Sequence, residues 1–330
     1  MTSSLVGSEM CIRDRFKLDP AFKDYIWGGT RLRDEYGKKC DYDKVAESWE
    51  LSCHKDGPSV VADGEYKGLT LNEYIKKAGK GVLGKNCERF ENFPILIKLI
   101  DAKDNLSVQV HPDNDYAMRV EGEYGKTEMW YVVDCDEGAT LLYGFKHEIT
   151  KEEFARRIAD NTLLEVTNAV PVKKGDVFFI KSGTLHAIGK GILIAEIQQN
   201  SNTTYRIYDY GRVGKDGKPR ELHVNKALDV TKLAPAEQYP ETPVEKKDGY
   251  DIKLLSKCEY FTTYRVNVET KAELDADENS FNSILVLEGE PVISGGETVS
   301  AKKGESVFIS AGTGKYTVEG KCTFVLTKID

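Results

Sequence analysis

Short runs of apolar residues, bounded by glycine, aspartate and lysine, recur along most of the chain. Clear examples are Val177–Ile180, Ile192–Ala195 and Ile284–Leu287. Short apolar runs between turn signals are typical of strands in an all-β sandwich or barrel. The pattern therefore predicts a mainly β protein.

Two segments break this pattern with helical signals. Residues 70–78 and 150–159 each open on a threonine followed three residues later by a glutamate. In such a capping box the two side chains satisfy backbone N–H groups at the start of a helix. The second segment also carries Phe154 and Ile158 at helical spacing. A few helices are therefore expected between the strands.

An internal repeat is the second strong signal. Residues 173–184 (KKGDVFFIKSGT) align without a gap against residues 302–313 (KKGESVFISAGT). Each copy reads as a turn, a strand and a second glycine turn, which predicts two related β-barrel units. His186 lies just past the first copy, whereas Lys315 takes the aligned position in the second. Only the first unit is therefore expected to keep metal chemistry.

The domain prediction follows from this repeat and from composition. The charged, proline-containing stretch 234–249 lacks strand or helix periodicity and marks a boundary. We predict a metal-binding catalytic domain with helical insertions over 16–238 and a C-terminal β domain without metal ligands over 239–330. Residues 1–15 lack the basic start and apolar core of a signal peptide. They are predicted to be a non-native or disordered leader.

Bulk composition narrows the partners. The net charge of -8 over 330 residues argues against nucleic acid, and an anionic substrate would need a locally basic pocket. No apolar run approaches the roughly 20 residues that span a bilayer. The seven cysteines are scattered and form no CxxC pair, which predicts a reduced cytoplasmic protein with free thiols.

Four residues form a candidate metal site. Gln109 and His111 project from the same face if their segment is extended. Glu128 precedes the apolar run Met129–Val133, where an unpaired buried charge would be costly. With His186, these residues offer mixed nitrogen and oxygen donors that suit zinc and leave room for another ligand. Gln109 is the weakest donor of the four.

The polar stretch 196–209 carries further candidate chemistry. Its ordinary interpretation is a solvated loop, but Glu196 and Arg206 flank it so that both would return to one pocket. Arg206 would hold a phosphate bidentately or stabilise an anionic intermediate. Lys98 and Lys126 are further cationic candidates. The chain has neither a GxxxxGK[ST] phosphate loop nor a GxSxG nucleophile elbow.

Five motifs together resemble one family. From Phe16 to Asp330 the chain resembles type I mannose-6-phosphate isomerases, also called phosphomannose isomerases, of the short bacterial form. The motifs are YIWGG (25–29), SVQVHPD (107–113), GKTE (125–128), GTLHA (183–187) and YRIYD (205–209). The resemblance implies a cupin fold and zinc-dependent interconversion of mannose 6-phosphate and fructose 6-phosphate.

The resemblance also implies roles for single residues. One zinc ion per chain would be held by Gln109, His111, Glu128 and His186, although some short members replace the glutamine. The family's Tyr-Arg motif places Arg206 in the active site.

For the proton transfer through a cis-enediolate we expect Glu196 as general base, with a pKa raised by burial, and Lys126 as the second candidate. Ser107 would assist phosphate binding and Trp27 would wall the pocket. The substrate would be a small phosphosugar, and the protein a monomer or weak homo-oligomer.

Two other functions stay open from the residues alone. His111, Glu128 and His186 would also suit the iron triad of a cupin oxygenase, which oxygen consumption with ferrous iron would reveal. A non-catalytic cupin would bind a phosphosugar without turnover. Gln109, Lys126 and Arg206 favour phosphosugar chemistry over the oxygenase.

Overall fold

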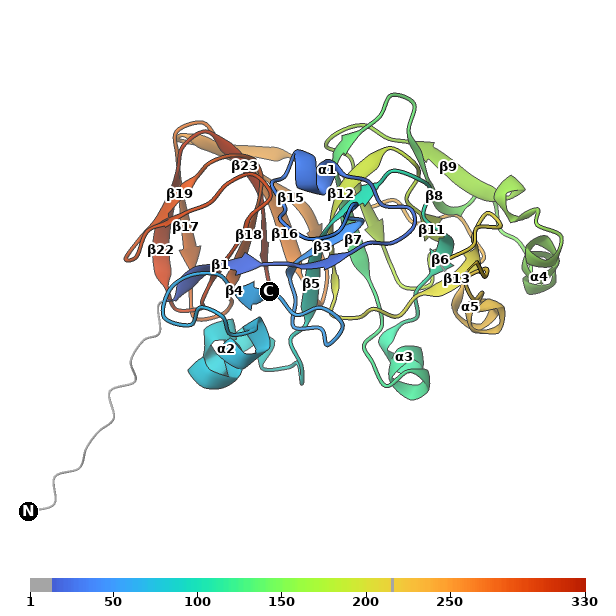
Figure 1. Ribbon diagram of the computed structural model, residues 1–330, viewed down its shortest axis with the longest axis horizontal. Helices are drawn as coiled ribbons and strands as arrows, with labels where there is room; N and C mark the ends of the chain where they lie inside the picture. The colour runs from blue at the N-terminus through green and yellow to red at the C-terminus, as the bar shows by residue number, and fades with distance from the viewer. Residues whose placement is uncertain (1–13, 215–216) are drawn as a thin grey trace, which may run out of the picture.

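The computed structural model describes residues 14–214 and 217–330, and these residues form a mainly β protein, as predicted. Their strands assemble into four antiparallel sheets of eight, six, five and four strands. Figure 1 shows two β units side by side, with the orange and red C-terminal strands at one end.

The first unit pairs the six-stranded sheet (order β10-β7-β12-β5-β3-β2) with the five-stranded sheet (order β13-β6-β11-β8-β9). Trp130, Ile194 and Leu141 belong to the apolar core between these two sheets. The strands are β2 (Ala21–Lys23), β3 (Glu47–Leu51), β5 (Ile95–Ala102), β6 (Val108–Val110), β7 (Glu128–Cys135), β8 (Thr140–Phe145), β9 (Thr167–Pro171), β10 (Val177–Ile180), β11 (His186–Ala187), β12 (Ile192–Gln199) and β13 (Tyr205–Tyr208).

The second unit pairs the eight-stranded sheet (order β14-β15-β16-β23-β18-β21-β1-β4) with the four-stranded sheet (order β17-β22-β19-β20). Val286, Phe324 and Val318 belong to its own core. The strands are β1 (Arg15–Asp19), β4 (Val60–Val61), β14 (Val244–Lys247), β15 (Tyr250–Lys257), β16 (Thr262–Val268), β17 (Lys271–Ala276), β18 (Asn282–Gly289), β19 (Val292–Ser294), β20 (Val299–Ser300), β21 (Ser306–Ile309), β22 (Gly314–Glu319) and β23 (Cys322–Lys328).

A third apolar core joins the two units. It contains Ile97 and Leu99 of β5 together with Phe281 and Phe308 from the C-terminal unit. Because side chains alternate across a strand, Lys98 points to the opposite face of the six-stranded sheet, into the first unit. The same strands therefore bury apolar residues against the second unit and direct polar residues into the first.

The N-terminal strands cross between the units. β1 pairs with β21, with Phe16 opposite Phe308, and with β4, so both join the C-terminal sheet. The segment assigned to the first domain thus contributes two strands to the sheet of the second unit, and the boundary near residue 238 stays a prediction. Of the predicted leader, residues 1–13 lie outside the described residues, and Arg15 begins β1.

Both predicted helices are present. In α2 (Leu71–Ala78) the side chains of Thr70 and Glu73 form the complete capping box. In α4 (Lys151–Ala159) Thr150 accepts from the Glu153 N–H, but the Glu153 carboxylate pairs with Arg157 instead of reaching back. The other helices are α1 (Arg31–Asp34), α3 (Asn114–Val120) and α5 (Val224–Val230), with short 3-10 turns η1 (Lys80–Leu83), η2 (Lys85–Cys87) and η3 (Leu163–Glu165). Within the described ranges, no helix is long and apolar enough to cross a membrane.

Candidate metal centre and substrate pocket

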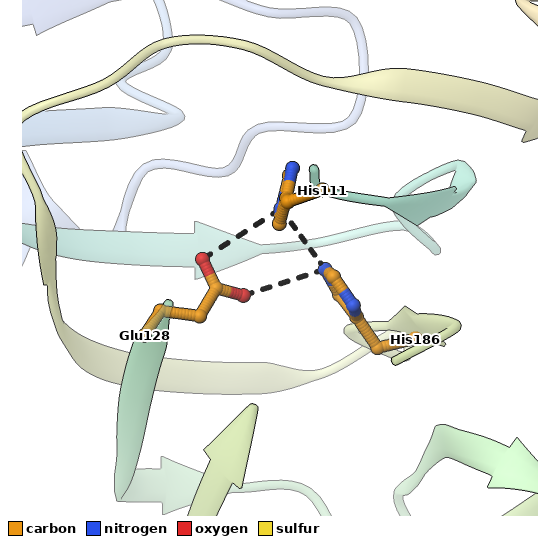
Figure 2. Close-up of side chains that lie close together, drawn as sticks. All are labelled: His111, Glu128 and His186. Carbon is orange, nitrogen blue, oxygen red and sulfur yellow. Dashed lines mark hydrogen bonds and ion pairs between the residues drawn. The ribbon is translucent and has the colours of Figure 1, made fainter. Parts of the chain in front are cut away.

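Three strands of the first unit bring His111, Glu128 and His186 together (Figure 2). His111 directly follows β6, Glu128 begins β7 and His186 begins β11. Pairing of β11 with β6 places His186 opposite Gln109, two residues from His111. All three side chains are buried, and their potential ligand atoms lie within 4.8 Å of one another.

The two imidazoles face each other through their Nε2 atoms, while each Nδ1 faces a backbone carbonyl. Nδ1 of His111 lies 2.8 Å from the Thr203 carbonyl oxygen, and Nδ1 of His186 lies 2.8 Å from the Thr184 carbonyl oxygen. A carbonyl only accepts, so each Nδ1 carries the proton and each neutral Nε2 keeps a lone pair. The two Nε2 atoms lie 3.2 Å apart. Two such lone pairs suit a shared cation.

The carboxylate of Glu128 completes this donor set. Its oxygens lie 3.3 Å from His186 Nε2 and 3.7 Å from His111 Nε2. An ion bound tetrahedrally at about 2.0–2.1 Å from each donor holds its donors about 3.4 Å apart. Oε1 has no hydrogen-bond partner and Oε2 lies 2.8 Å from the Lys126 ammonium nitrogen, although the residue is fully buried. The three residues therefore fit a small divalent metal such as zinc.

The protonation states agree with a metal site. Burial lowers the pKa of His186 to about 4 and the pKa of His111 well below its usual value, so both rings are neutral near pH 7. Burial, assisted by the neighbouring charge of Glu196, raises the pKa of Glu128 to about 7. A bound cation would keep that carboxylate ionised.

A cavity of about 250 Å³ lies next to the donor group and is linked to it through Lys126, although the three donors themselves do not line it. Its wall includes Lys126, whose ammonium nitrogen lies 2.8 Å from Glu128 and 3.2 Å from His111. The lining residues are Tyr25, Trp27, Glu47, Lys98, Ile100, Leu106, Ser107, Gln109, Lys126, Ile188, Glu196, Asn202, Thr204, Arg206 and Arg220. The cavity thus gathers every remaining residue that the sequence singled out for the substrate, the metal or catalysis.

Gln109 faces the cavity but differs from the other predicted ligands. It lies half-buried between His186 and Arg206 on the neighbouring strands. Ser107 and Trp27 are buried in the same wall, and Trp27 also belongs to the apolar core of the first unit. Trp27 therefore lines the cavity and packs in the core at the same time.

Two buried lysines and their carboxylate partners line the cavity. Lys98 lies 3.3 Å from Glu196 and 3.5 Å from Glu47, and Lys126 lies 3.7 Å from Glu196. Burial disfavours the charge of Lys98, but the carboxylates outweigh this effect and raise its pKa. With Glu128, three carboxylates face two ammonium groups, which leaves one negative charge for a further cation to offset.

The expected pKa of Glu196 is wrong in direction. Burial does act to raise it, but Lys126 and Lys98 outweigh burial and lower the pKa to about 2. The indole N–H of Trp130 also donates to this carboxylate at 2.9 Å. The sequence named both lysines as cationic candidates but not their proximity to Glu196, because Lys98 lies on β5 and Lys126 lies just before β7.

Two charged cavity residues, Glu47 and Arg220, were not identified from the sequence. Glu47 accepts from the Trp49 indole N–H at 2.7 Å, and a carboxylate in an otherwise buried strand was the available signal. Arg220 stands beside Arg206 and is held by Asp209 at 2.5 and 2.7 Å. No local pattern marks Arg220, because Asp209 reaches it across a loop.

Arg206 carries an unpaired donor group. Its Nη1 donates to the Glu221 carbonyl at 2.9 Å, but its buried Nε has no hydrogen-bond partner. Burial and the positive charge of Arg220 both lower its pKa. An anion bound in the cavity would offset both effects.

Comparisons with known proteins place the chain in a family. Residues 15–138 match the catalytic domain of type I phosphomannose isomerases, and residues 251–329 match the mannose-6-phosphate isomerase cupin domain. Mannose-6-phosphate isomerase ManA of Bacillus subtilis is 39% identical over 94% of this chain and 97% of its own length. Mannose-6-phosphate isomerase of Streptococcus mutans is 40% identical over 86% of this chain and 88% of its own.

Solved structures agree with these sequence matches. A crystal structure of the mannose 6-phosphate isomerase from Bacillus subtilis matches with a TM-score of 0.90 and 38% identity, covering 96% of this chain and 99% of that chain. Fold and site together define a cupin protein with a candidate metal centre, which confirms the predicted architecture. The chain belongs to the type I phosphomannose isomerase family and is an enzyme of the mannose-6-phosphate isomerase class.

Proposed function

We propose that the protein interconverts mannose 6-phosphate and fructose 6-phosphate, using one zinc ion per chain and a cis-enediolate intermediate. The observation that carries this proposal is the buried group of His111, Glu128 and His186 beside a cavity lined by Lys126 and Arg206. The relatives are named as mannose-6-phosphate isomerases, which supports mannose 6-phosphate as a substrate.

His111, Glu128 and His186 would hold the metal, with Gln109 as a fourth, weaker ligand facing the same cavity. When bound, zinc would act as a Lewis acid and template for the sugar oxygens. The protein's own part is to keep both imidazoles neutral and correctly turned through the carbonyls of Thr184 and Thr203.

Isomerisation moves a proton between C2 and C1 of the sugar, so the protein must accept a proton and return it. We propose Glu196 as the acceptor and Lys126 as the donor to the sugar oxygen. Glu196 is ionised at neutral pH, and Lys126 Nζ lies 3.7 Å from it, close enough to exchange a proton with small movements. Lys98 keeps Glu196 ionised between turnovers.

Arg206 would stabilise the phosphate or the enediolate charge, and its unpaired buried Nε supports this role. Ser107 would assist phosphate binding and Trp27 would wall the pocket, and both line the cavity. The structure adds Arg220 as a second cationic group beside Arg206. This arginine pair supplies the locally basic pocket that an anionic substrate requires in an acidic protein.

We also propose a reduced cytoplasmic protein that is a monomer or weak homo-oligomer. All six cysteines among the described residues are free, which supports a reducing compartment. The exposed large apolar side chains of the described residues, such as Tyr42, Leu164 and Val292, lie on separate segments.

The test is conversion of mannose 6-phosphate to fructose 6-phosphate before and after chelation, followed by addition of zinc. Loss of activity with the chelator and recovery with zinc is the expected result. Absence of turnover in folded, zinc-loaded protein would contradict the proposal. Oxygen consumption with ferrous iron would then favour the oxygenase, and phosphosugar binding alone would favour a non-catalytic cupin.

A further inference from the structure

The His111 imidazole depends on a carbonyl outside any regular strand. Thr203 supplies this carbonyl, 2.8 Å from Nδ1, from the segment 200–204 between β12 and β13. No sheet hydrogen bonds fix that segment, so other groups must hold the carbonyl in place. Asn202 and Thr204 of the same segment line the substrate cavity.

One carboxylate holds three consecutive residues of this segment. Glu123 Oε2 accepts from the Asn202 N–H at 3.1 Å, the Thr203 hydroxyl at 3.1 Å and the Ser201 hydroxyl at 3.4 Å. Glu123 comes from the turn after α3, almost 80 residues earlier in the chain. It therefore joins three residues of the segment, to which Asp56 adds one contact with the Asn202 side chain at 2.9 Å and Gln198 one with the Ser201 carbonyl at 2.6 Å.

A buried histidine fixes the other oxygen of Glu123. His54 is 4% exposed, and its Nε2 lies 3.1 Å from Glu123 Oε1. Because the Asp56 N–H donates to His54 Nδ1 at 3.1 Å, the proton sits on Nε2, and His54 donates to Glu123. Trp49 packs edge-on against the His54 ring and so restricts its rotation.

We propose that Glu123 is a positioning residue of the metal centre, which holds the Thr203 carbonyl so that His111 keeps its proton on Nδ1 and turns Nε2 to the metal. This inference rests on the metal site of the proposed function. It assigns His54 the task of orienting Glu123. Outer partners of metal-bound histidines are typically worth 10–100-fold in metal affinity.

The carboxylate is needed for its two acceptor atoms. Glu123→Gln keeps the size but changes one acceptor into an NH₂ donor. That donor faces either the His54 Nε2–H or the N–H and hydroxyl donors of residues 201–203, so one set of bonds is lost. We expect the zinc dissociation constant to rise about tenfold in this variant.

Glu121→Gln is the matched control. Glu121 lies two residues away with similar side-chain exposure (26% against 21%), and it accepts from Tyr205 and Lys226 instead of the 201–203 segment. Zinc affinity is measured by competition with a chromogenic chelator. The His111 Nδ1–H proton signal in NMR is followed in parallel, because a merely structural change elsewhere would leave it in place.

In Glu123→Gln the Nδ1–H signal should shift and exchange faster with water, while Glu121→Gln keeps both the signal and the zinc affinity. Unchanged zinc affinity within twofold and an unchanged signal in Glu123→Gln would overturn the inference and leave the proposed function standing. Failure of the wild type to bind zinc would overturn both. If Glu123→Gln does not fold, Glu123→Asp replaces it, and wild-type affinity in that variant overturns the inference.

Discussion

The two copies of the internal repeat share a backbone but not a site. Strands β10 and β21 occupy the same aligned positions, and the turn glycines Gly175 and Gly304 have φ values of 91° and 87°. Strand register extends the alignment beyond the repeat. Ile180 lies opposite Glu128, and its counterpart Ile309 lies opposite Asn282.

The donors of the first copy have unsuitable counterparts in the second. Lys315, aligned with His186, is exposed. In the strand register it lies opposite the exposed Asp275, just as His186 lies opposite Gln109. Asn282 is buried, but its amide donates to the Tyr316 hydroxyl at 2.9 Å and to the Asp275 carbonyl at 2.9 Å. A metal site therefore needs buried donors with unsatisfied lone pairs, which the shared hairpin does not by itself supply.

The largest expected effect comes from replacing His186, and the aligned Lys315 provides the control. His186→Ala should weaken zinc binding by more than about 100-fold, since even outer-shell changes cost 10–100-fold, and should abolish isomerase activity with it. Zinc content by atomic emission and turnover are measured on the same sample. Lys315→Ala is the matched control and should keep both. Normal activity in metal-depleted His186→Ala protein would sink the proposed scheme.

Arg206 separates turnover from metal binding. Arg206→Ala should keep zinc and lower kcat/KM about 10²–10³-fold, the usual cost of removing a donor that stabilises developing charge. Steady-state kinetics and zinc content provide the measurement. Arg265→Ala in the second unit removes an arginine paired with Asp251 and should leave kcat/KM unchanged. A loss of zinc in Arg206→Ala would contradict the assigned role.

Zinc affinity should depend on pH through Glu128. The metal needs the ionised carboxylate, whose pKa in the metal-free protein is raised by burial to about 7. Below that pH a proton must leave before zinc binds, so affinity should fall roughly tenfold per unit, and above it affinity should level off. His186, with a pKa of about 4, does not contribute there. Glu128→Gln should flatten this dependence; a flat profile in the wild type would contradict it.

The turn glycines give the smallest effect and compare the two copies directly. An alanine at either position adopts a left-handed conformation that costs about 1–2 kcal/mol. At Gly175 the nearest atom to the added Cβ is the Tyr131 hydroxyl at 4.0 Å, whereas at Gly304 it is the Tyr36 carbonyl at 2.8 Å. Gly304→Ala should therefore lower the free energy of unfolding more than Gly175→Ala in urea titrations. Equal losses would show that Tyr36 moves aside freely.

Local chemistry made much of the fold predictable. The apolar runs, the threonine caps of α2 and α4 and the repeat each reflect interactions between residues near in sequence. The His111, Glu128 and His186 group was also identified from the sequence, because buried donor types flanked strand-like segments and because the motifs resemble a known family.

Only the tertiary structure decided the charges and the supports of the site. Glu47 and Arg220 reach the cavity, and Glu123 reaches the Thr203 segment, through contacts between distant parts of the chain. The pKa of Glu196 depends on Lys98 of β5 and on Lys126, just before β7. Such electrostatic balances depend on distances of a few ångströms between strands, which residue order along one strand does not specify.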